Sequence, residues 1–509
     1  MHMMAAVLLA AAAAASQGKL VVLVVIDQLR YQDVLWLAPE LGPKGFAGMG
    51  RAVPLRYETA VAETAVGHAV LATGAYPDVN GIVGNSFWQG ARYQEAVEDP
   101  SCPVWGASVG RSAVALRAPT VGDMLKLNTG GAARVVAVAV KDRSAIFLAG
   151  SSADLALWWE ADVGEMASST CYAPAPPDWL PRRPAEAFKD WVWTMSRPDS
   201  IARLLPQPRA AAASPVYDLG PEFPHKVGQG KLDQRLYRAI RYTPAGTTVA
   251  LRTARAAARA LKLGESGKTD LLALALASVD GVGHQYGTLS RERVDAILRV
   301  HDELSAFLDE LRGRLGPRLS IVLTSDHGLT PTEADEQRLR VQGGTIATDE
   351  LIVRLNRALD DAIGKRPEGW VAGIEGNTLS LRPPFPSKAV EAAVEVLRRE
   401  PGFLRVIPAA EVDKAEPFIR RAYFPGRSGQ VLLVARPLWT LKPRAAGADH
   451  GSFWNDDSLV PLMIQSARFR LRSDAQFRAT QVAPTVAALL DTAPPSAAFD
   501  SPAVEQKQP

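Results

Sequence analysis

The sequence predicts an α/β fold with a central, mostly parallel sheet that is sandwiched by helices. Three apolar runs support this prediction, because each is rich in strand-forming residues and delivers an aspartate at its carboxyl end. Such runs are typical of strands buried on both faces of a parallel sheet. Ligands of these folds bind beside the carboxyl ends of the strands, so we expect the three aspartates at a site. The runs are Val21–Gln28, Leu271–Asp280 and Leu319–Asp326.

The size and charge of the chain exclude some classes of protein. It has 509 residues, of which 22% are charged, and its net charge is only +3. This composition gives no indication of nucleic-acid binding, or of membrane-surface binding through basic residues. The length alone would suggest about three domains, but a large α/β enzyme with insertions is an equally good interpretation.

The N-terminus predicts export from the cytoplasm. Met1–Ala15 is apolar, too short to span a bilayer and rich in small residues, so we expect a signal peptide at residues 1–18 and a periplasmic or secreted protein. The alternative is an alanine-rich tail of a cytoplasmic protein, because a basic leading region is missing. No later segment is long and apolar enough to predict a transmembrane helix. In an exported protein Cys102 and Cys171 could pair, and two unpaired thiols are the alternative.

Residues 19–345 are expected to form the core of the fold. Thr64–Gly74 predicts a helix with Thr64 as its N-cap. The irregular span at about 151–245, which contains Trp158 and Trp159, is interpreted as a cap beside the site. The other expected elements are a connector at Gly42–Gly50, helices at Pro119–Leu127, Thr247–Lys262 and Val294–Leu311, and a strand at Ala133–Val140.

The pattern changes at residues 346–428, which predict a small α+β insertion with its own core. The chain is then expected to return to the main core over residues 429–495, and the tail at 496–509 to be disordered. The elements expected in the insertion are helices at Leu351–Ile363 and Lys388–Glu400 and strands at Trp370–Leu381 and Phe403–Ile407. The elements expected after it are a strand at Gly429–Ala435 and a helix at Thr480–Leu490.

Six residues at or near the ends of these elements suit metal ligation. A mixture of carboxylates and imidazoles fits zinc or a similar divalent ion. Two sets of three would make a two-metal site, whose ions lie roughly 4 Å apart and hold the attacking and leaving oxygens of an in-line displacement. One Asp-His pair after a strand usually marks only a turn, but three aspartate-ended strands rarely arise by accident. The six residues are Asp27, Asp280, His284, Asp326, His327 and His450.

Seven motifs give the chain a resemblance to the alkaline phosphatase superfamily. It is most similar to the bacterial single-chain, zinc-dependent alkaline phosphatases with a threonine nucleophile, which are related to the nucleotide pyrophosphatase/phosphodiesterases. The motifs span nearly the whole mature chain in family order. They are VVIDQLR (Val24–Arg30), TAVGHAVLATG (Thr64–Gly74), GIVGNSFW (Gly81–Trp88), VKDRSAIFLAG (Val140–Gly150), VDGVGHQYG (Val279–Gly287), TSDHG (Thr324–Gly328) and ADHGSFWNDDSLVPLMI (Ala448–Ile464).

The resemblance implies a phosphomonoesterase with two zinc ions and a covalent phosphothreonine at Thr64. A threonine hydroxyl is a poor nucleophile until a metal or base removes its proton. A helix N-terminus beside it would also favour a bound phosphate. Without the other motifs, Thr64 would be interpreted as an ordinary helix cap. The implied ligand sets are Asp280, His284 and His450 for one zinc, and Asp27, Asp326 and His327 with Thr64 for the other.

The resemblance also implies that Asn85, Lys141 and Arg143 contact the substrate. Lys141 and Arg143 are two residues apart, so in an extended segment they would point the same way. Two cations aimed at the non-bridging oxygens would favour a monoester, which carries one more negative charge than a diester. We therefore expect small phosphate monoesters as substrates. The alternative for this pair is a solvated strand end.

Two other functions stay open at this point. A phosphodiesterase or nucleotide pyrophosphatase on the same metal core would have an apolar or aromatic pocket in place of the cation pair. A non-catalytic phosphate-binding or surface protein could also keep the fold. His68, one helical turn from Thr64, is either a support for the ligands or a packed histidine, and Glu63 is expected to point away from the phosphate. We expect a monomer without nucleic-acid binding or stable membrane insertion.

Overall fold

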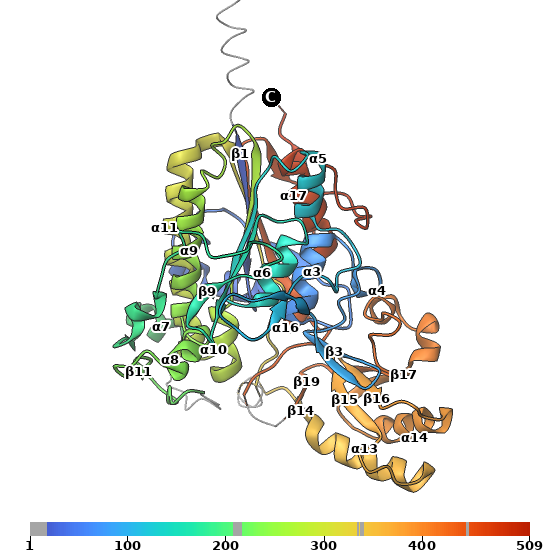
Figure 1. Ribbon diagram of the computed structural model, residues 1–509. Helices are drawn as coiled ribbons and strands as arrows, with labels where there is room; N and C mark the ends of the chain where they lie inside the picture. The colour runs from blue at the N-terminus through green and yellow to red at the C-terminus, as the bar shows by residue number, and fades with distance from the viewer. Residues whose placement is uncertain (1–17, 207–215, 333–334, 336–339, 444–446, 509) are drawn as a thin grey trace, which may run out of the picture.

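The computed structural model describes residues 18–206, 216–332, 335, 340–443 and 447–508, and Figure 1 shows its ribbon. Nearly all of the predicted signal peptide lies outside these ranges. The main element is a nine-stranded sheet. In sheet order its strands are β22 (Phe477–Arg478), β2 (Val53–Arg56), β20 (Leu459–Gln465), β13 (Leu319–Thr324), β1 (Lys19–Ile26), β12 (Thr269–Leu276), β7 (Val135–Ala139), β8 (Leu155–Glu160) and β9 (Glu165–Ala167).

The centre of this sheet is parallel, as the sequence predicts. Strands β13, β1, β12, β7 and β8 pair in parallel, while β20 and β9 run antiparallel to their neighbours. In β1 successive side chains enter two different hydrophobic clusters, one on each face of the sheet. The strand is therefore buried on both faces, which explains its unbroken apolar sequence.

Helices cover both faces, so the predicted α/β sandwich is confirmed (Figure 1). One layer contains α2 (Tyr31–Leu41), α7 (Pro198–Leu204), α8 (Gln234–Arg241), α9 (Ala245–Ala260), α10 (Ser278–Tyr286) and α11 (Arg291–Leu315). The other contains α3 (Thr64–Thr73), α5 (Val121–Asn128), α6 (Asp142–Ala149) and α17 (Val482–Leu490). Across the described residues, no helix combines the length and apolarity needed to cross a membrane.

A second, smaller sheet lies beside the main body (Figure 1, orange). Its strand order is β15 (Val371–Glu375), β16 (Thr378–Leu381), β18 (Val431–Ala435) and β17 (Phe403–Pro408), and α13 (Thr348–Ile363) and α14 (Ser387–Arg398) share its hydrophobic cluster. The expected strand Trp370–Leu381 is a hairpin, because Asn377 turns the chain with a φ of 56°. The strand expected to return to the main core, β18, instead pairs with β16 and β17.

Short elements complete the chain. They are α4 (Pro77–Asn80), β3 (Ser86–Gln89), β4 (Arg92–Glu95), β5 (Glu98–Pro103), β6 (Gly110–Arg111), β10 (Val192–Trp193), β11 (His225–Lys226), β14 (Gly344–Ala347), α15 (Pro417–Arg420), β19 (Trp439–Lys442), α16 (Asn455–Ser458), β21 (Phe469–Leu471) and β23 (Val504–Gln506). Two sequence-based expectations are wrong here. Within the span 151–245 that is expected to form a cap, strands β8 and β9 instead extend the main sheet. The tail expected to be disordered forms β23, which pairs with β21.

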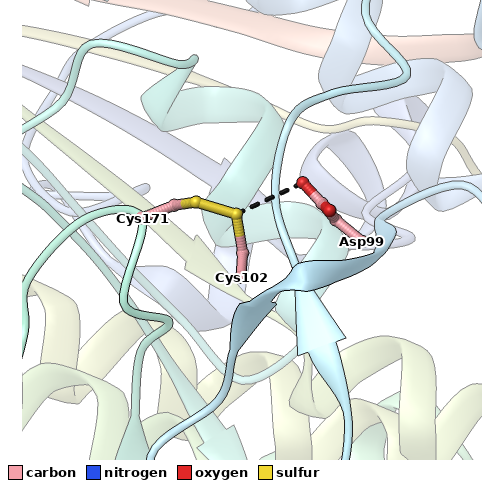
Figure 2. A group of neighbouring side chains, drawn as sticks. All are labelled: Asp99, Cys102 and Cys171. Atoms are coloured by element: carbon pink, nitrogen blue, oxygen red, sulfur yellow. Dashed lines mark hydrogen bonds between the residues drawn. A yellow bond between two sulfur atoms is a disulfide. The ribbon is translucent and has the colours of Figure 1, made fainter.

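Cys102 and Cys171 form a disulfide (Figure 2). Cys102 lies in β5, and Cys171 follows β9, so the bond ties the β5–β6 hairpin to the edge of the main sheet. Asp99 lies beside the bond (Figure 2). Because both sulfurs are used in the bond, this trio does not offer thiolate ligands to a metal.

Candidate active site

Three aspartates meet at the carboxyl edge of the main sheet. Strands β1, β12 and β13 are adjacent and in parallel register, so their carboxyl ends are level. Asp27 follows β1 directly, Asp326 is the second residue after β13, and Asp280 lies in the first turn of α10 after β12. All three side chains are buried. Sheet register thus brings Asp27 together with two carboxylates that lie about 250 and 300 residues further along the sequence.

Three histidines surround these carboxylates in one common orientation. The Nδ1 atoms of His284, His327 and His450 lie 2.9, 2.9 and 2.8 Å from the backbone oxygens of Ala448, Gly328 and Ala62. A carbonyl accepts but does not donate, so each Nδ1 carries the proton and each Nε2 is free to act as a ligand. The Nε2 atoms face the aspartates. This arrangement, with the outer nitrogen anchored by a carbonyl, is the usual one for metal-binding histidines.

The distances divide the predicted ligands into two overlapping groups. Asp280, His284 and His450 offer ligand atoms within 4.8 Å of one another, and so do Asp27, Asp280 and His327. Asp326 borders the second group, since its Oδ2 lies 3.4 Å from His327 Nε2. All six predicted residues therefore converge, and Asp280 is shared between the two groups.

The electrostatics of this cluster favour a cation. Burial alone would lower the pKa of His327, but Asp326, Asp27 and Asp280 outweigh it and raise the pKa to about 10. In the same way Asp280 and Asp449 raise the pKa of His284 to about 9, against the effect of burial. A mixed oxygen and nitrogen donor set with surplus negative charge fits a divalent metal.

Thr64 lies at the start of α3 and faces the cluster. Its Oγ1 is 3.3 Å from His327 Nε2 and accepts a hydrogen bond of 3.0 Å from Lys141 Nζ. Thr64 is the first residue of the helix and Glu63 is the N-cap, so the expected N-cap position of Thr64 is wrong by one residue. A Cβ atom at Gly67 would lie 2.3 Å from the backbone oxygen of Asp326, so this glycine lets α3 pack directly against the end of β13.

Lys141 and Arg143 lie at the start of α6. Lys141 is the N-cap of this helix and Arg143 is in its first turn, so the extended segment expected from the sequence is wrong. Both side chains nevertheless line the same cavity as Thr64. Lys141 Nζ lies 2.7 Å from Asp27 Oδ2 and 2.6 Å from Asp280 Oδ2. The Nε atom of Arg143 is buried and, among the described residues, has no hydrogen-bond partner.

Asn85 is tied to the N-terminus of α3 from both sides. Its Oδ1 accepts a hydrogen bond from the backbone N–H of Ala65, and its own backbone N–H donates to Glu63 Oε2 at 2.7 Å. Glu63 points to this loop and borders the cavity. Burial raises the pKa of Glu63 to about 7, against the effect of the hydrogen bond from Asn85, so protonation can reduce its repulsion of an anion.

The cavity above Thr64 has a volume of about 390 Å³ and is built by both parts of the molecule. The main body, which contains the nine-stranded sheet, supplies its charged floor. The smaller unit, which contains the sheet β15–β16–β18–β17 with α13 and α14, supplies a roof that includes Ile352 and Ile374. Trp88 from β3 also lines the cavity. A small organic group attached to a phosphate could be enclosed here.

Two further residues support the ligands. Gln28 has a side chain that donates a 3.1 Å hydrogen bond to Asp280, and no motif argument singled it out. For His68 the sequence leaves two interpretations open, a support for the ligands or a packed histidine. Its Nδ1 lies 3.2 Å from Asp326 Oδ2 and 2.8 Å from the backbone oxygen of Thr64, so it contacts a predicted ligand. The i, i+4 spacing of Thr64 and His68 was the available signal for the second contact.

The family model for type I phosphodiesterase/nucleotide pyrophosphatase matches residues 21–453, so the chain belongs to this family. Three relatives cover almost the whole chain. The alkaline phosphatase PhoV of Synechococcus elongatus is 29% identical, with 94% of this chain and 91% of PhoV covered. A protein of Myroides odoratus named calcium-transporting ATPase is 27% identical (96% and 95% covered), and the alkaline phosphatase PafA of Elizabethkingia meningoseptica is 28% identical (96% and 94%).

The crystal structure of wild-type alkaline phosphatase PafA has the same fold. The TM-score is 0.86 at 24% sequence identity, with 96% of this chain and 98% of the PafA chain covered. The central sheet and the helices on both faces described above are therefore the alkaline phosphatase-like fold that the resemblance implied.

Proposed function

We propose that the protein is a metal-dependent phosphomonoesterase that hydrolyses small phosphate monoesters through a covalent phosphothreonine at Thr64. One observation carries the proposal: a threonine hydroxyl at a helix N-terminus faces buried carboxylates, oriented histidines and a lysine in a single cavity. Two relatives that match nearly the whole chain are named alkaline phosphatases, which supports the same assignment.

We propose two zinc ions as the cofactors. Asp280, His284 and His450 would hold one ion. Asp27, Asp326 and His327, together with Thr64, would hold the other. When bound, the ions would supply positive charge that favours deprotonated oxygens at the attacking and leaving positions.

The reaction has two displacements at phosphorus. Thr64 Oγ1 forms a bond to phosphorus while the bond to the leaving oxygen breaks, and that oxygen leaves with a proton as an alcohol. A water molecule then attacks the phosphothreonine, which breaks the Thr64 Oγ1–phosphorus bond and releases inorganic phosphate. Lys141, 3.0 Å from Thr64 Oγ1, is within reach of a phosphoryl group on that oxygen, and Asn85 and Arg143 line the same cavity. Lys141, Arg143 and the N-terminus of α3 would stabilise the negative charge of the phosphoryl group in both displacements.

A phosphodiesterase is the second candidate, because the family model bears that name and Trp88, Ile352 and Ile374 give the cavity an apolar side. The two cations are the reason for preferring monoesters. The test compares an aryl phosphate monoester with its matched aryl diester, using zinc-loaded and chelated protein at mildly alkaline pH. Zinc-dependent turnover that strongly favours the monoester is expected.

Arg143→Met makes this test sharper. If Arg143 contacts a non-bridging oxygen, its loss lowers monoester kcat/KM by roughly 10² and diester kcat/KM far less. Arg238→Met is the matched control, because Arg238 is exposed and pairs with Asp162 instead. A preference for the diester in the wild-type protein would assign the chain to phosphodiesterase activity. Equal losses of kcat/KM for the monoester and the diester would show that Arg143 does not discriminate between them.

We propose further that the protein acts outside the cytoplasm as a monomer, after removal of a signal peptide at residues 1–18. The Cys102–Cys171 disulfide supports an oxidising compartment. We also propose that residues 346–428 form the greater part of a small inserted unit, to which β18 contributes a strand. Cell fractionation and the mass of the purified protein in solution test the location and the oligomeric state.

A further inference from the structure

Gln28 has an unusual backbone conformation at the end of the central strand. It follows Asp27, is fully buried and has a φ of 69°, in the left-handed region that side chains other than glycine rarely adopt. Such conformations raise the free energy of the folded state and persist only where the surroundings hold them, often at functional sites. The contacts of Gln28 show what this conformation achieves.

Gln28 contacts two of the converging carboxylates through different groups. Its side-chain Nε2 donates to Asp280 Oδ1 at 3.1 Å, and its backbone N–H donates to Asp326 Oδ1 at 3.3 Å. In the proposed assignment, Asp280 and Asp326 belong to the two different zinc sites. Gln28 itself is fully buried and does not line the cavity above Thr64.

The structure holds Gln28 tightly from two sides. Arg293 Nη2 donates to the backbone oxygen of Gln28 at 2.8 Å and to Asp33 Oδ2 at 2.7 Å, so a buried ion pair anchors the strained turn. On the other side, a Cβ atom at Gly283 would lie 1.8 Å from Gln28 Oε1. Gly283 lies in α10, one residue before His284, and its missing side chain leaves room for the amide of Gln28.

We propose that Gln28 is a positioning residue that joins the two metal sites: its side-chain amide orients Asp280 and its backbone N–H orients Asp326. Each hydrogen bond limits the rotation of a carboxylate. Asp280 keeps Oδ1, which accepts from Gln28, 3.2 Å from His284 Nε2, and Asp326 keeps its other oxygen, Oδ2, 3.4 Å from His327 Nε2. Outer contacts of this kind typically change metal affinity 10- to 100-fold. The inference rests on the proposed function, because it concerns the ligands of the proposed zinc ions.

The test measures metal binding directly. Metal-free full-length protein is titrated with zinc by calorimetry and with cobalt by visible absorption, which reports ligand geometry. Gln28→Met keeps the shape but removes the amide. Gly283→Ala leaves Gln28 in the sequence but displaces its side chain. Asn80→Leu is the matched control, since Asn80 is also fully buried and, among the described residues, its side-chain amide bonds to the backbone of Ala75 and Ile82 and not to a carboxylate.

We expect zinc affinity to fall roughly 10- to 100-fold in Gln28→Met and Gly283→Ala, with an altered cobalt spectrum in both, and to stay near wild type in Asn80→Leu. Wild-type affinity and spectrum in Gln28→Met would overturn this inference alone. An equal loss in Asn80→Leu would also overturn it, because the effect would then come from losing any buried amide. Wild-type protein that binds neither metal would overturn the proposed function together with this inference.

Discussion

At the scale of single residues, the proposed chemistry depends on the hydroxyl of Thr64. Thr64→Ala removes the attacking oxygen but none of the six carboxylate and imidazole ligands. We expect kcat to fall by about 10³ or more, while the fold is retained and zinc still binds through the six remaining ligands. Thr64→Ser, which restores an oxygen at this position, should recover most of the activity. Steady-state hydrolysis of an aryl phosphate gives the rates, and mass spectrometry of acid-quenched wild-type enzyme detects the phosphothreonine.

Thr73→Ala is the control for this prediction. Thr73 lies at the other end of α3, where its Oγ1 donates to the backbone oxygen of Ala69 and is remote from the metal ligands. This variant should keep wild-type kcat. Turnover by Thr64→Ala at the wild-type rate would show that the phosphoryl group is never transferred to this residue.

Sequence reasoning anticipated the convergence of the six ligand residues, because each follows an apolar strand or lies in a recognisable motif. Gln28 was missed because its importance depends on a positive φ and on contacts with Asp280 and Asp326, which are about 250 and 300 residues away. Neither property follows from local composition. No pattern in a single sequence indicates a residue whose role depends on strand register and backbone conformation.

At the scale of elements, α16 connects two of the ligand loops. Asp457 in this helix accepts hydrogen bonds from Thr330 Oγ1 at 2.9 Å and from the backbone N–H of Ser452 at 2.8 Å. These partners follow His327 and His450 by two or three residues. Burial raises the pKa of Asp457 from 3.8 to about 6, despite the opposing effect of the hydrogen bonds.

This shift predicts a pH-dependent stability. The folded state binds the Asp457 proton more tightly than the unfolded state does. The contribution of this proton to the free energy of unfolding is therefore complete below about pH 4 and is lost as the pH rises through about 6. The loss should be about 3 kcal/mol at most. Asp457→Asn should remove this part of the pH dependence. Urea unfolding of the chelated wild-type protein and the chelated variant at pH 4.5 and 7.0 measures this pH dependence. Equal changes in the free energy of unfolding between the two pH values in both proteins would contradict the prediction.

Element boundaries were predicted less well than element types. The long apolar strands β1, β12 and β13 were located within a few residues, since burial on both faces leaves an unbroken apolar run. The start of α6 and the membership of β18 were wrong for a different reason. Lys141 and Arg143 are compatible with a strand end or a first helical turn. The sequence of a buried strand such as β18 does not indicate which sheet the strand joins.

At the scale of the whole molecule, the disulfide joins two segments 69 residues apart in the sequence. Replacing both Cys102 and Cys171 with serine should lower the free energy of unfolding by roughly 4 kcal/mol, because the unfolded chain regains the entropy of an open loop. Neither cysteine lines the cavity above Thr64, so kcat should stay within about twofold. Denaturant unfolding and aryl phosphate hydrolysis test the two parts, and an unchanged unfolding midpoint would contradict the first.

The cavity is shared between the two units, and Asn377 joins them at the site. Its Nδ2 donates to the backbone oxygens of Ala60 and Gly451, which lie in the loops before Thr64 and after His450. Asn377→Gly removes these bonds and also suits the positive φ of 56° at this position. The variant should therefore loosen the roof without straining the turn.

Loosening the roof should affect the organic part of the substrate more than its phosphate. We expect Asn377→Gly to raise KM for an aryl phosphate several-fold, because two hydrogen bonds of about 1 kcal/mol each no longer hold the roof in place. The inhibition constant of inorganic phosphate should change little, since phosphate has no group that reaches the roof. Asn356→Gly is the control, because among the described residues the Asn356 side chain bonds within the smaller unit, where it accepts from the backbone N–H groups of Trp370 and Val371. Equal increases for substrate and phosphate would instead show that Asn377 supports the charged floor of the cavity, and that the smaller unit takes no part in selecting the leaving group.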